Sequence, residues 1–234
     1  MATSLSDWDK PTQYERWYSS SLGRAYAASV ERIVRPWLVE LGNARIADVG
    51  CGPALTLERL LPPDATVVGV DCSLAMAGRA MVRGRQTGRP NFVAVGSVKS
   101  LPFRDASIDA VLCVNCLEFV DDRAAAFREI ARVLRRSGQA ILGVLNVRSV
   151  WELSRRLRRP FTRRSYYQGR FFRKDELCAA CAAVGLRPEE VRTAVHFPPV
   201  RPGPLVGLVD RLDARQQARG DRSGAVILCR CRKM

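Results

Sequence analysis

A short apolar segment followed by two closely spaced glycines carries the residues best placed to bind a ligand. The segment is Ala44–Val49, the acid Asp48 lies near its end, and Gly50 and Gly52 follow. Glycine permits a tight turn and lets a ligand approach the backbone closely. The apolar residues at positions 55, 57, 60 and 61 predict a helix after Ala54, whose first N–H groups would face that ligand. The stretch therefore predicts a strand, a turn and a helix around a cofactor.

The residue types in this turn distinguish between two classes of cofactor. The dinucleotide fingerprint G-x-G-x-x-G requires Gly or Ala at position 55, where this chain has Leu55. Asp48 would repel a pyrophosphate, whereas it would attract the ammonium and sulfonium groups of S-adenosylmethionine. These two residues favour S-adenosylmethionine over a nicotinamide or flavin dinucleotide.

A second acid follows a β-branched segment at 66–70. Asp71 ends that segment, and an acid at the end of the second strand can accept hydrogen bonds from both ribose hydroxyls. Asp71 is therefore the predicted ribose ligand.

Three motifs in this order resemble those of the class I S-adenosylmethionine-dependent methyltransferases. Residues 48–52 match the start of their D-V-G-C-G-T-G motif, and Pro53 and Ala54 depart from it. Residues 96–111 are similar to G-D-A-x-x-L-P-F-x-D-x-S-F-D-x-V of methyltransferases resembling the ubiquinone and menaquinone biosynthesis enzymes, the type 11 domain. Residues 128–138 are similar to E-x-x-R-V-L-x-P-G-G. The resemblance covers roughly residues 44–145 and implies methyl transfer from S-adenosylmethionine.

The same resemblance extends to a segment before the first strand. Residues 14–26 are similar to the Y-D-x-W-Y-x-T-x-x-G-R opening of many small-molecule methyltransferases, which folds over the cofactor; the alternative is a hydrophobic edge packed on the core. The resemblance also implies that Ser97 lies at the adenine position. The candidate cofactor-binding residues are Asp48, Gly50, Cys51, Gly52, Ala54, Asp71, Cys72, Ser97, Val98, Asn115, Tyr14 and Tyr18.

Two side chains are candidates for a general base. Glu118 follows the fourth predicted strand, and His196 is the only histidine. Methyl transfer from a sulfonium is an in-line displacement with an activated leaving group, so a base is optional. The alternatives are an exposed glutamate at a helix start and an incidental histidine. Asn115 lacks the two prolines of the N-P-P-Y motif of amino-group methyltransferases, which argues against methylation of an amine.

Alternating strands and helices predict a Rossmann-like, doubly wound α/β fold. We expect an N-terminal lid and helix at 1–43, a cofactor-binding core at 44–145, a basic substrate-side insertion at 146–174 and the rest of the same sheet at 175–234. The resemblance implies that the last strand is antiparallel and inserts beside the fifth, in a mostly parallel seven-stranded sheet with helices on both faces. Strands are expected at 44–49, 66–71, 92–95, 108–114, 139–145, 187–195 and 224–231, and helices at 25–41, 73–85, 121–135 and 171–184.

The chain carries a formal net charge of +15, which is typical of proteins that bind nucleic acid. An arginine-rich composition explains much of this charge without any partner. Its local concentration at 155–173 could contact an anionic membrane, a nucleic acid or an anionic substrate, and the alternative is a solvated lid helix.

Eight cysteines invite a disulfide or metal reading. The sequence shows no secretory signal and no apolar stretch long enough for a membrane span, so we expect a cytoplasmic protein with reduced thiols. Cys113 with Cys116 and Cys178 with Cys181 form C-x-x-C pairs that lack knuckle-type glycines, and we expect no metal site.

The sequence therefore predicts a methyltransferase whose acceptor is an oxygen or carbon of a small molecule. One alternative is an RNA methyltransferase that uses the arginine-rich segment. Another is a catalytically inert module that binds S-adenosylmethionine or docks on a membrane, which the departures at Pro53, Ala54 and Ser97 leave open.

Overall fold

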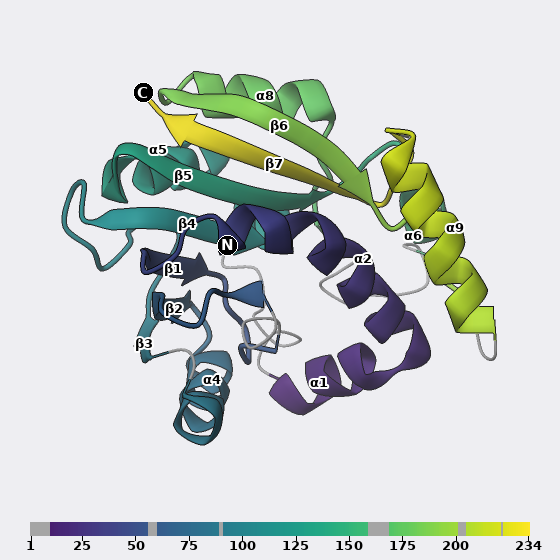
Figure 1. Cartoon of the computed structure of the whole chain (residues 1–234), viewed down its shortest axis with the longest axis horizontal. Coiled ribbons are helices and arrows are strands. Elements are labelled where there is room, and N and C mark those ends of the chain that lie inside the picture. Colours follow the sequence, from purple (N-terminus) through teal and green to yellow (C-terminus); the bar gives the residue numbers. More distant parts are fainter. Residues whose placement is uncertain (1–9, 56–59, 89–90, 159–168, 201–204, 221) are drawn as a thin grey trace.

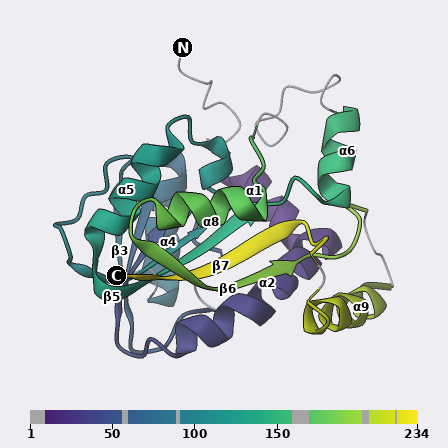
Figure 2. The same cartoon turned by 90° about the horizontal axis from the view of Figure 1, so that it is seen from above.

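A seven-stranded sheet crosses the molecule, with helices on both of its faces (Figures 1 and 2). The computed structural model describes residues 10–55, 60–88, 91–158, 169–200, 205–220 and 222–234. The strands are β1 (Arg45–Val49), β2 (Thr66–Asp71), β3 (Phe92–Val95), β4 (Ile108–Val114), β5 (Leu134–Leu145), β6 (Leu186–Ala194) and β7 (Val226–Lys233). The helices are α1 (Pro11–Ser19), α2 (Ser21–Val39), α4 (Leu74–Thr87), α5 (Arg123–Val133), α6 (Val150–Arg158), α8 (Lys174–Ala182) and α9 (Val206–Ala218), with a short 3₁₀ turn, η2, at Leu117–Phe119.

The strand order is β3-β2-β1-β4-β5-β7-β6. The strands from β1 to β5 pair in parallel, and β7 pairs antiparallel with β5 and with β6. This confirms the Rossmann-like, doubly wound sheet with an antiparallel last strand. The order reverses between β1 and β4, and in such sheets ligands bind outside the carboxyl ends of the strands at that point.

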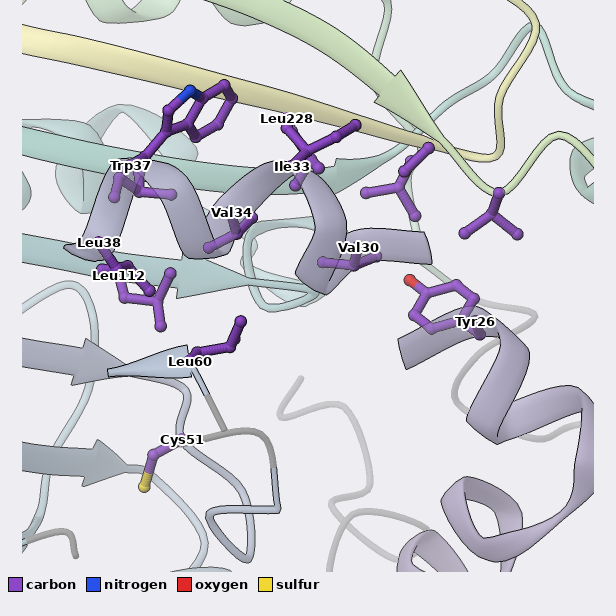
Figure 3. Packing of buried hydrophobic residues seen from close by; sticks show 14 of the residues in the cluster. Tyr26, Val30, Ile33, Val34, Trp37, Leu38, Cys51, Leu60, Leu112 and Leu228 are labelled. Carbon is purple, nitrogen blue, oxygen red and sulfur yellow. The ribbon is translucent and has the colours of Figure 1, made fainter. Parts of the chain in front are cut away.

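Two clusters of buried side chains cover the two faces of the sheet. Alternate strand residues point to opposite faces, so Ile46 and Leu112 face α2 while Ala47 and Val111 face α5 and α8. Figure 3 shows side chains of α2 from Val30 to Leu38 lying over Leu112 and Leu228. Burying each large aliphatic side chain contributes about 1.5–3 kcal/mol, so the sheet is anchored from both sides.

The bend between α1 and α2 places α1 beside the cofactor edge of the sheet. Ser20 caps α2, since its Oγ accepts a hydrogen bond from the Gly23 N–H at 3.1 Å. A Cβ added at Gly23 would lie 2.0 Å from the Trp17 carbonyl oxygen. Only glycine therefore allows the two helices to approach so closely.

The structure differs from the sequence expectations at segment boundaries and in one new element. The helix expected to reach Arg135 ends at Val133, and β5 begins at Leu134 because that residue pairs with Ile108 ahead of a bulge. Helix α9 was not predicted, because the side chains that it buries, Asp213 and Gln217, are polar. Residues 56–59 of the helix expected after the glycine turn, residues 159–168 of the insertion and residues 201–204 lie outside the described residues.

Helix α6 buries a different face from the one that its sequence suggests. Val150, Leu153 and Leu157 are 57%, 59% and 67% exposed, whereas Glu152 and Arg155 are buried. Arg155 pairs with Glu152 at 2.5 Å and lies over the Phe171 ring. One member of the expected arginine cluster is thus part of the packed interior. None of the helices in the described part of the chain is long and apolar enough to cross a membrane.

Candidate cofactor site

The turn after β1 has the geometry of a ligand cradle. Gly50 has a φ of +74°, and a Cβ there would lie 2.7 Å from the Cβ of Cys116, so this position requires glycine. The N–H groups of Gly50 and Cys51 both donate to the Val70 carbonyl oxygen, at 2.7 and 3.1 Å. Ala54 is buried and has a φ of +57°, a backbone strain of the kind found at functional sites. The turn is therefore fixed against the ends of β2 and β4.

Asp71 closes this turn from the end of β2. Its Oδ2 accepts a hydrogen bond from the Gly52 N–H at 2.8 Å, and its Oδ1 accepts one from the Ser73 N–H at 2.9 Å. A carboxylate has about four acceptor sites, so Asp71 keeps capacity for further hydroxyl donors. The backbone holds this acid in place for a ligand.

Asp48 lies behind the turn and is only 5% exposed. Burial, and then the negative charge of Asp71, raises the pKa of Asp48 to about 7. No cation among the described residues pairs with Asp48. A cationic ligand beside it would supply the missing counter-charge.

The residues expected at the adenine end lie in the loops after β2 and β3. The Gly96 N–H donates to the Asp71 carbonyl oxygen at 2.9 Å, which joins the two loops. Ser97 Oγ accepts a hydrogen bond from the Lys99 N–H at 3.2 Å, Val98 is buried, and Cys72 is exposed. These residues continue the cradle along the same edge of the sheet.

Helix α1 covers the turn with aromatic side chains. The Tyr14 ring lies 3.9 Å from the position of a Cβ at Gly52, and the Tyr14 hydroxyl donates to the Tyr18 hydroxyl at 3.4 Å. Burial raises the pKa of both tyrosines, so both are neutral at physiological pH. Tyr14 and Tyr18 therefore lie beside the glycine turn, and their role as a lid stays a prediction.

Sequence reasoning missed the extent of this aromatic surface. The Tyr26 hydroxyl donates to Asn115 Oδ1 at 2.9 Å, and Asn115 follows β4 with a φ of +56°. The Tyr26 ring centroid lies 5.7 Å from that of Trp151 on α6. A chain of ring contacts thus runs from the glycine turn to α6; we call it the aromatic wall, comprising Tyr14, Trp17, Tyr18, Tyr26 and Trp151.

An ion-pair network fastens α1 to α4. Glu15 pairs with Arg79 at 2.7 Å and with Arg83 at 3.1 Å, and Arg83 Nε donates to the Pro53 carbonyl oxygen at 3.0 Å. Charged side chains therefore connect α1 with α4 and α4 with the glycine turn.

Glu118 lies in η2 and is 2% exposed, unlike the exposed residue of the alternative reading. Its Oε1 accepts a hydrogen bond from the Leu145 N–H at 2.5 Å, and Oε2 has no partner among the described residues. Burial raises the pKa of Glu118 to about 7. The group can gain or lose a proton near neutral pH.

His196 is fully buried between β6 and α9. Its Nδ1 lies 3.0 Å from Asp213 Oδ1, and its Nε2 lies 3.1 Å from Thr193 Oγ1. The His196 N–H also donates to Asp213 Oδ1 at 2.8 Å. Both ring nitrogens are occupied, so this conformation leaves the ring no contact with an acceptor.

Comparison with known proteins agrees with this geometry. Residues 47–142 match the family described as "Methyltransferase domain". An uncharacterized protein of Mycobacterium tuberculosis is 30% identical over 186 residues, which cover 80% of this chain and 61% of that protein. The ubiquinone biosynthesis O-methyltransferase of Xanthomonas oryzae is 34% identical over 109 residues, 46% of each chain. The chain thus spans less than two thirds of the length of these relatives.

A solved structure shares the fold over almost the whole chain. It is described as a SAM-dependent methyltransferase, "possible histamine N-methyltransferase", from Thermotoga maritima, with a TM-score of 0.72 and 24% identity, and the match covers 98% of this chain and 100% of that one. Residues 47–142 therefore match a methyltransferase domain, and the chain shares its fold with a SAM-dependent methyltransferase.

Proposed function

We propose that this protein transfers the methyl group of S-adenosylmethionine to an oxygen or carbon atom of a small-molecule acceptor. The observation that carries the proposal is the pair of acids in the cradle, with Asp48 buried behind the turn and Asp71 held at its rim by two backbone N–H groups. A cofactor with an ammonium, a sulfonium and a ribose matches these two carboxylates, whereas a pyrophosphate does not.

In this proposal, different residues around the cradle contact different parts of the cofactor. Asp71 accepts hydrogen bonds from the ribose hydroxyls, and Ser97 and Val98 lie beside the adenine. Asp48 and the turn at 50–52 lie beside the cationic amino-acid end, and Tyr14 covers it. The cofactor supplies an electrophilic methyl group with an activated leaving group.

The aromatic wall supports a flat, largely apolar acceptor. Tyr18 is only partly buried, and its ring packs against the buried Tyr26, which in turn packs against the buried Trp151; an aromatic acceptor would pack well against Tyr18. Holding the acceptor in line with the methyl group in a dry site can lower the barrier by roughly 7–11 kcal/mol. The relative named as a ubiquinone biosynthesis O-methyltransferase supports a phenolic acceptor.

The two candidate bases receive different roles in the proposal. Glu118 stays the candidate base, because its Oε2 has no partner among the described residues and its pKa lies near 7. His196 acts as a positioning residue, because its contacts with Asp213 and Thr193 fix the end of β6 against α9.

The arginine-rich segment gives less support to an RNA or membrane partner than its sequence suggests. Arg155 is buried, and Arg156 pairs with Glu152 at 2.8 Å. We therefore keep the small-molecule acceptor as the proposed function.

The proposal is tested by incubating the protein with methyl-labelled S-adenosylmethionine and a panel of phenols, catechols, quinone precursors and total RNA. We expect label transfer and S-adenosylhomocysteine formation that depend on a phenolic or carbon acceptor. Transfer to RNA alone would overturn the small-molecule acceptor. Cofactor binding with no transfer to any acceptor would favour the inert binding module.

A further inference from the structure

Three cysteines outside the cradle converge between α8 and β7, and a fourth lies nearby in sequence on α8. The sulfur atoms of Cys181, Cys229 and Cys231 all lie within 4.8 Å of one another, and all three residues are buried. The sulfurs of Cys229 and Cys231 are 3.3 Å apart. Cys178 is half-buried and lies three residues before Cys181 on the same helix.

The convergence follows from two short spacings on different elements. Residues three apart on a helix share a face, so Cys178 and Cys181 point the same way. Residues two apart on a strand also share a face, and this places Cys229 and Cys231 opposite α8. Neither spacing alone is strong evidence for a metal site, and from the sequence we expect none there. The fold brings the C-x-x-C and C-x-C pairs together.

These distances suit one metal ion. Zinc binds thiolate sulfur at about 2.3 Å in a tetrahedral site, so two sulfurs of one site lie about 3.8 Å apart. The observed cluster needs shifts of an ångström or less to reach that geometry. Oxygen-preferring ions such as Mg²⁺ or Ca²⁺ do not match a set of sulfur ligands.

We propose that Cys181, Cys229 and Cys231, with Cys178 as the fourth ligand, bind one thiophilic metal ion such as Zn²⁺ and so fasten α8 to β7. Each thiol releases its proton to solvent as its sulfur–metal bond forms, and no electron is exchanged. Thiolate is the form of cysteine that binds a metal, so binding displaces protons from the thiols. Affinity therefore falls as the pH falls.

The position explains what such an ion would do. Helix α8 buries only Leu177 and Cys181 among its nine residues, so its apolar anchorage to the sheet is small. Lys233 shares the face of β7 with the two cysteines, and its Nζ donates to the Leu134 carbonyl oxygen at 2.6 Å. A positive charge on that face offsets the negative charge of a metal bound by four thiolates.

The first test uses the reduced, folded, full-length protein and Co²⁺ as a spectroscopic probe. We expect one equivalent of Co²⁺ to produce thiolate-to-cobalt charge-transfer absorption in the near ultraviolet, and Zn²⁺ to displace it and raise the melting temperature. A folded, reduced protein that shows no such absorption and no melting shift with Zn²⁺ would refute the site and leave three hydrogen-bonded core thiols.

Variants then assign the ligands. Cys181→Ser and Cys229→Ser should weaken Zn²⁺ binding about tenfold or more, while the exposed Cys72→Ser, read only for metal binding, should match the wild type. Should the buried variants fail to fold, the half-buried Cys178→Ser decides the fourth ligand. Unchanged affinity and cobalt absorption in Cys178→Ser would contradict the four-thiolate site. These readouts are independent of methyl transfer.

Discussion

At the scale of single residues, the carboxyl groups of Asp48 and Asp71 repel each other electrostatically, and a cationic ligand would offset that repulsion. Asp48 has a pKa of about 7 because it is buried and lies near Asp71. A bound ammonium or sulfonium group favours the ionised form of Asp48, so cofactor binding expels a proton below about pH 7. The cradle is thus electrostatically complete only with a cationic ligand.

This electrostatics predicts how cofactor affinity depends on pH. The affinity for S-adenosylmethionine should rise between about pH 6 and pH 8 as Asp48 ionises, by up to about tenfold per unit below the pKa. Asp48→Asn should bind more weakly at high pH and lose this dependence. Calorimetric titrations at three pH values measure it, and an equally steep dependence in the variant would assign the proton to another group.

The same pKa shift makes a prediction about stability. The folded state holds the Asp48 proton more tightly than the unfolded chain does, so this group lowers the free energy of unfolding as the pH rises from about 4 to 7. Asp48→Asn should therefore stabilise the ligand-free protein at about pH 8 by about 1–3 kcal/mol. Urea unfolding measures this change, and a destabilised variant at that pH would contradict the burial argument.

Asp71 is expected to contribute to cofactor binding directly. Asp71→Ala removes the ribose acceptor and also frees the Gly52 and Ser73 N–H groups, so affinity should fall about tenfold or more. Asp105→Ala is the matched control, since that exposed acid pairs with Arg132 before β4, at the opposite edge of the sheet. Equal affinities for the Asp71 variant and the wild type would place the ribose elsewhere.

Glu118 separates a catalytic from a structural role. Glu118→Gln still accepts the Leu145 N–H but cannot take up a proton, so a base role predicts an acceptor-dependent turnover about 10²–10⁴-fold lower with unchanged cofactor affinity. Glu176→Gln, on the neighbouring α8, controls for loss of a carboxylate that pairs with Arg123. Wild-type turnover in the Glu118 variant would make this acid structural.

At the scale of elements, α1 is the predicted lid, and ion pairs attach it to α4. Glu15→Gln breaks the pairs with Arg79 and Arg83, and exposed ion pairs contribute only about 0.2–1 kcal/mol each. Overall stability should therefore change little, while S-adenosylmethionine dissociates several-fold faster because Tyr14 is held less firmly over the turn. Stopped-flow fluorescence measures the dissociation rate. The control is Glu189→Gln, which breaks a distant surface ion pair with Arg232.

The elements differ in how well their sequences predict them. The strands have β-branched or continuous apolar runs, so β1, β2 and β4 follow from local pattern, as do Asp48 and Asp71 near the ends of β1 and β2. Helix α9 has no apolar pattern that predicts its buried face, because its buried residues Asp213 and Gln217 form hydrogen bonds with His196 and Ser29. The buried face of α6 likewise depends on Phe171, which no local pattern connects to Arg155.

The site shows the same division. Asp48, the glycine turn and Asp71 are close in sequence to the strand ends that present them, and the fold places them together. The aromatic wall joins residues from α1, α2 and α6, and the cysteine cluster joins α8 with β7. These groupings depend on tertiary packing. The sequence therefore shows which aromatic and cysteine residues are present, but not which of them come into contact.

At the scale of the whole molecule, the glycine turn and Asp71 lie at the carboxyl ends of β1 and β2, and the aromatic wall begins beside them. The strand order reverses between β1 and β4, where we propose that the cofactor binds, and α1, α2 and α6, drawn in Figures 1 and 2, carry the residues of the aromatic wall. The cysteine cluster lies on the α8 face, within the part of the sheet that β7 completes. The proposed metal site and the cradle therefore share no residue, so the two proposals can be tested separately.

The most direct test of the central claim is a calorimetric titration of the reduced protein with S-adenosylmethionine, S-adenosylhomocysteine and NADH in parallel. The cradle predicts single-site micromolar binding of the first two and none of NADH, because Asp48 and Leu55 oppose a dinucleotide. Binding of NADH, or of none of the three, would contradict the assignment of this turn to S-adenosylmethionine.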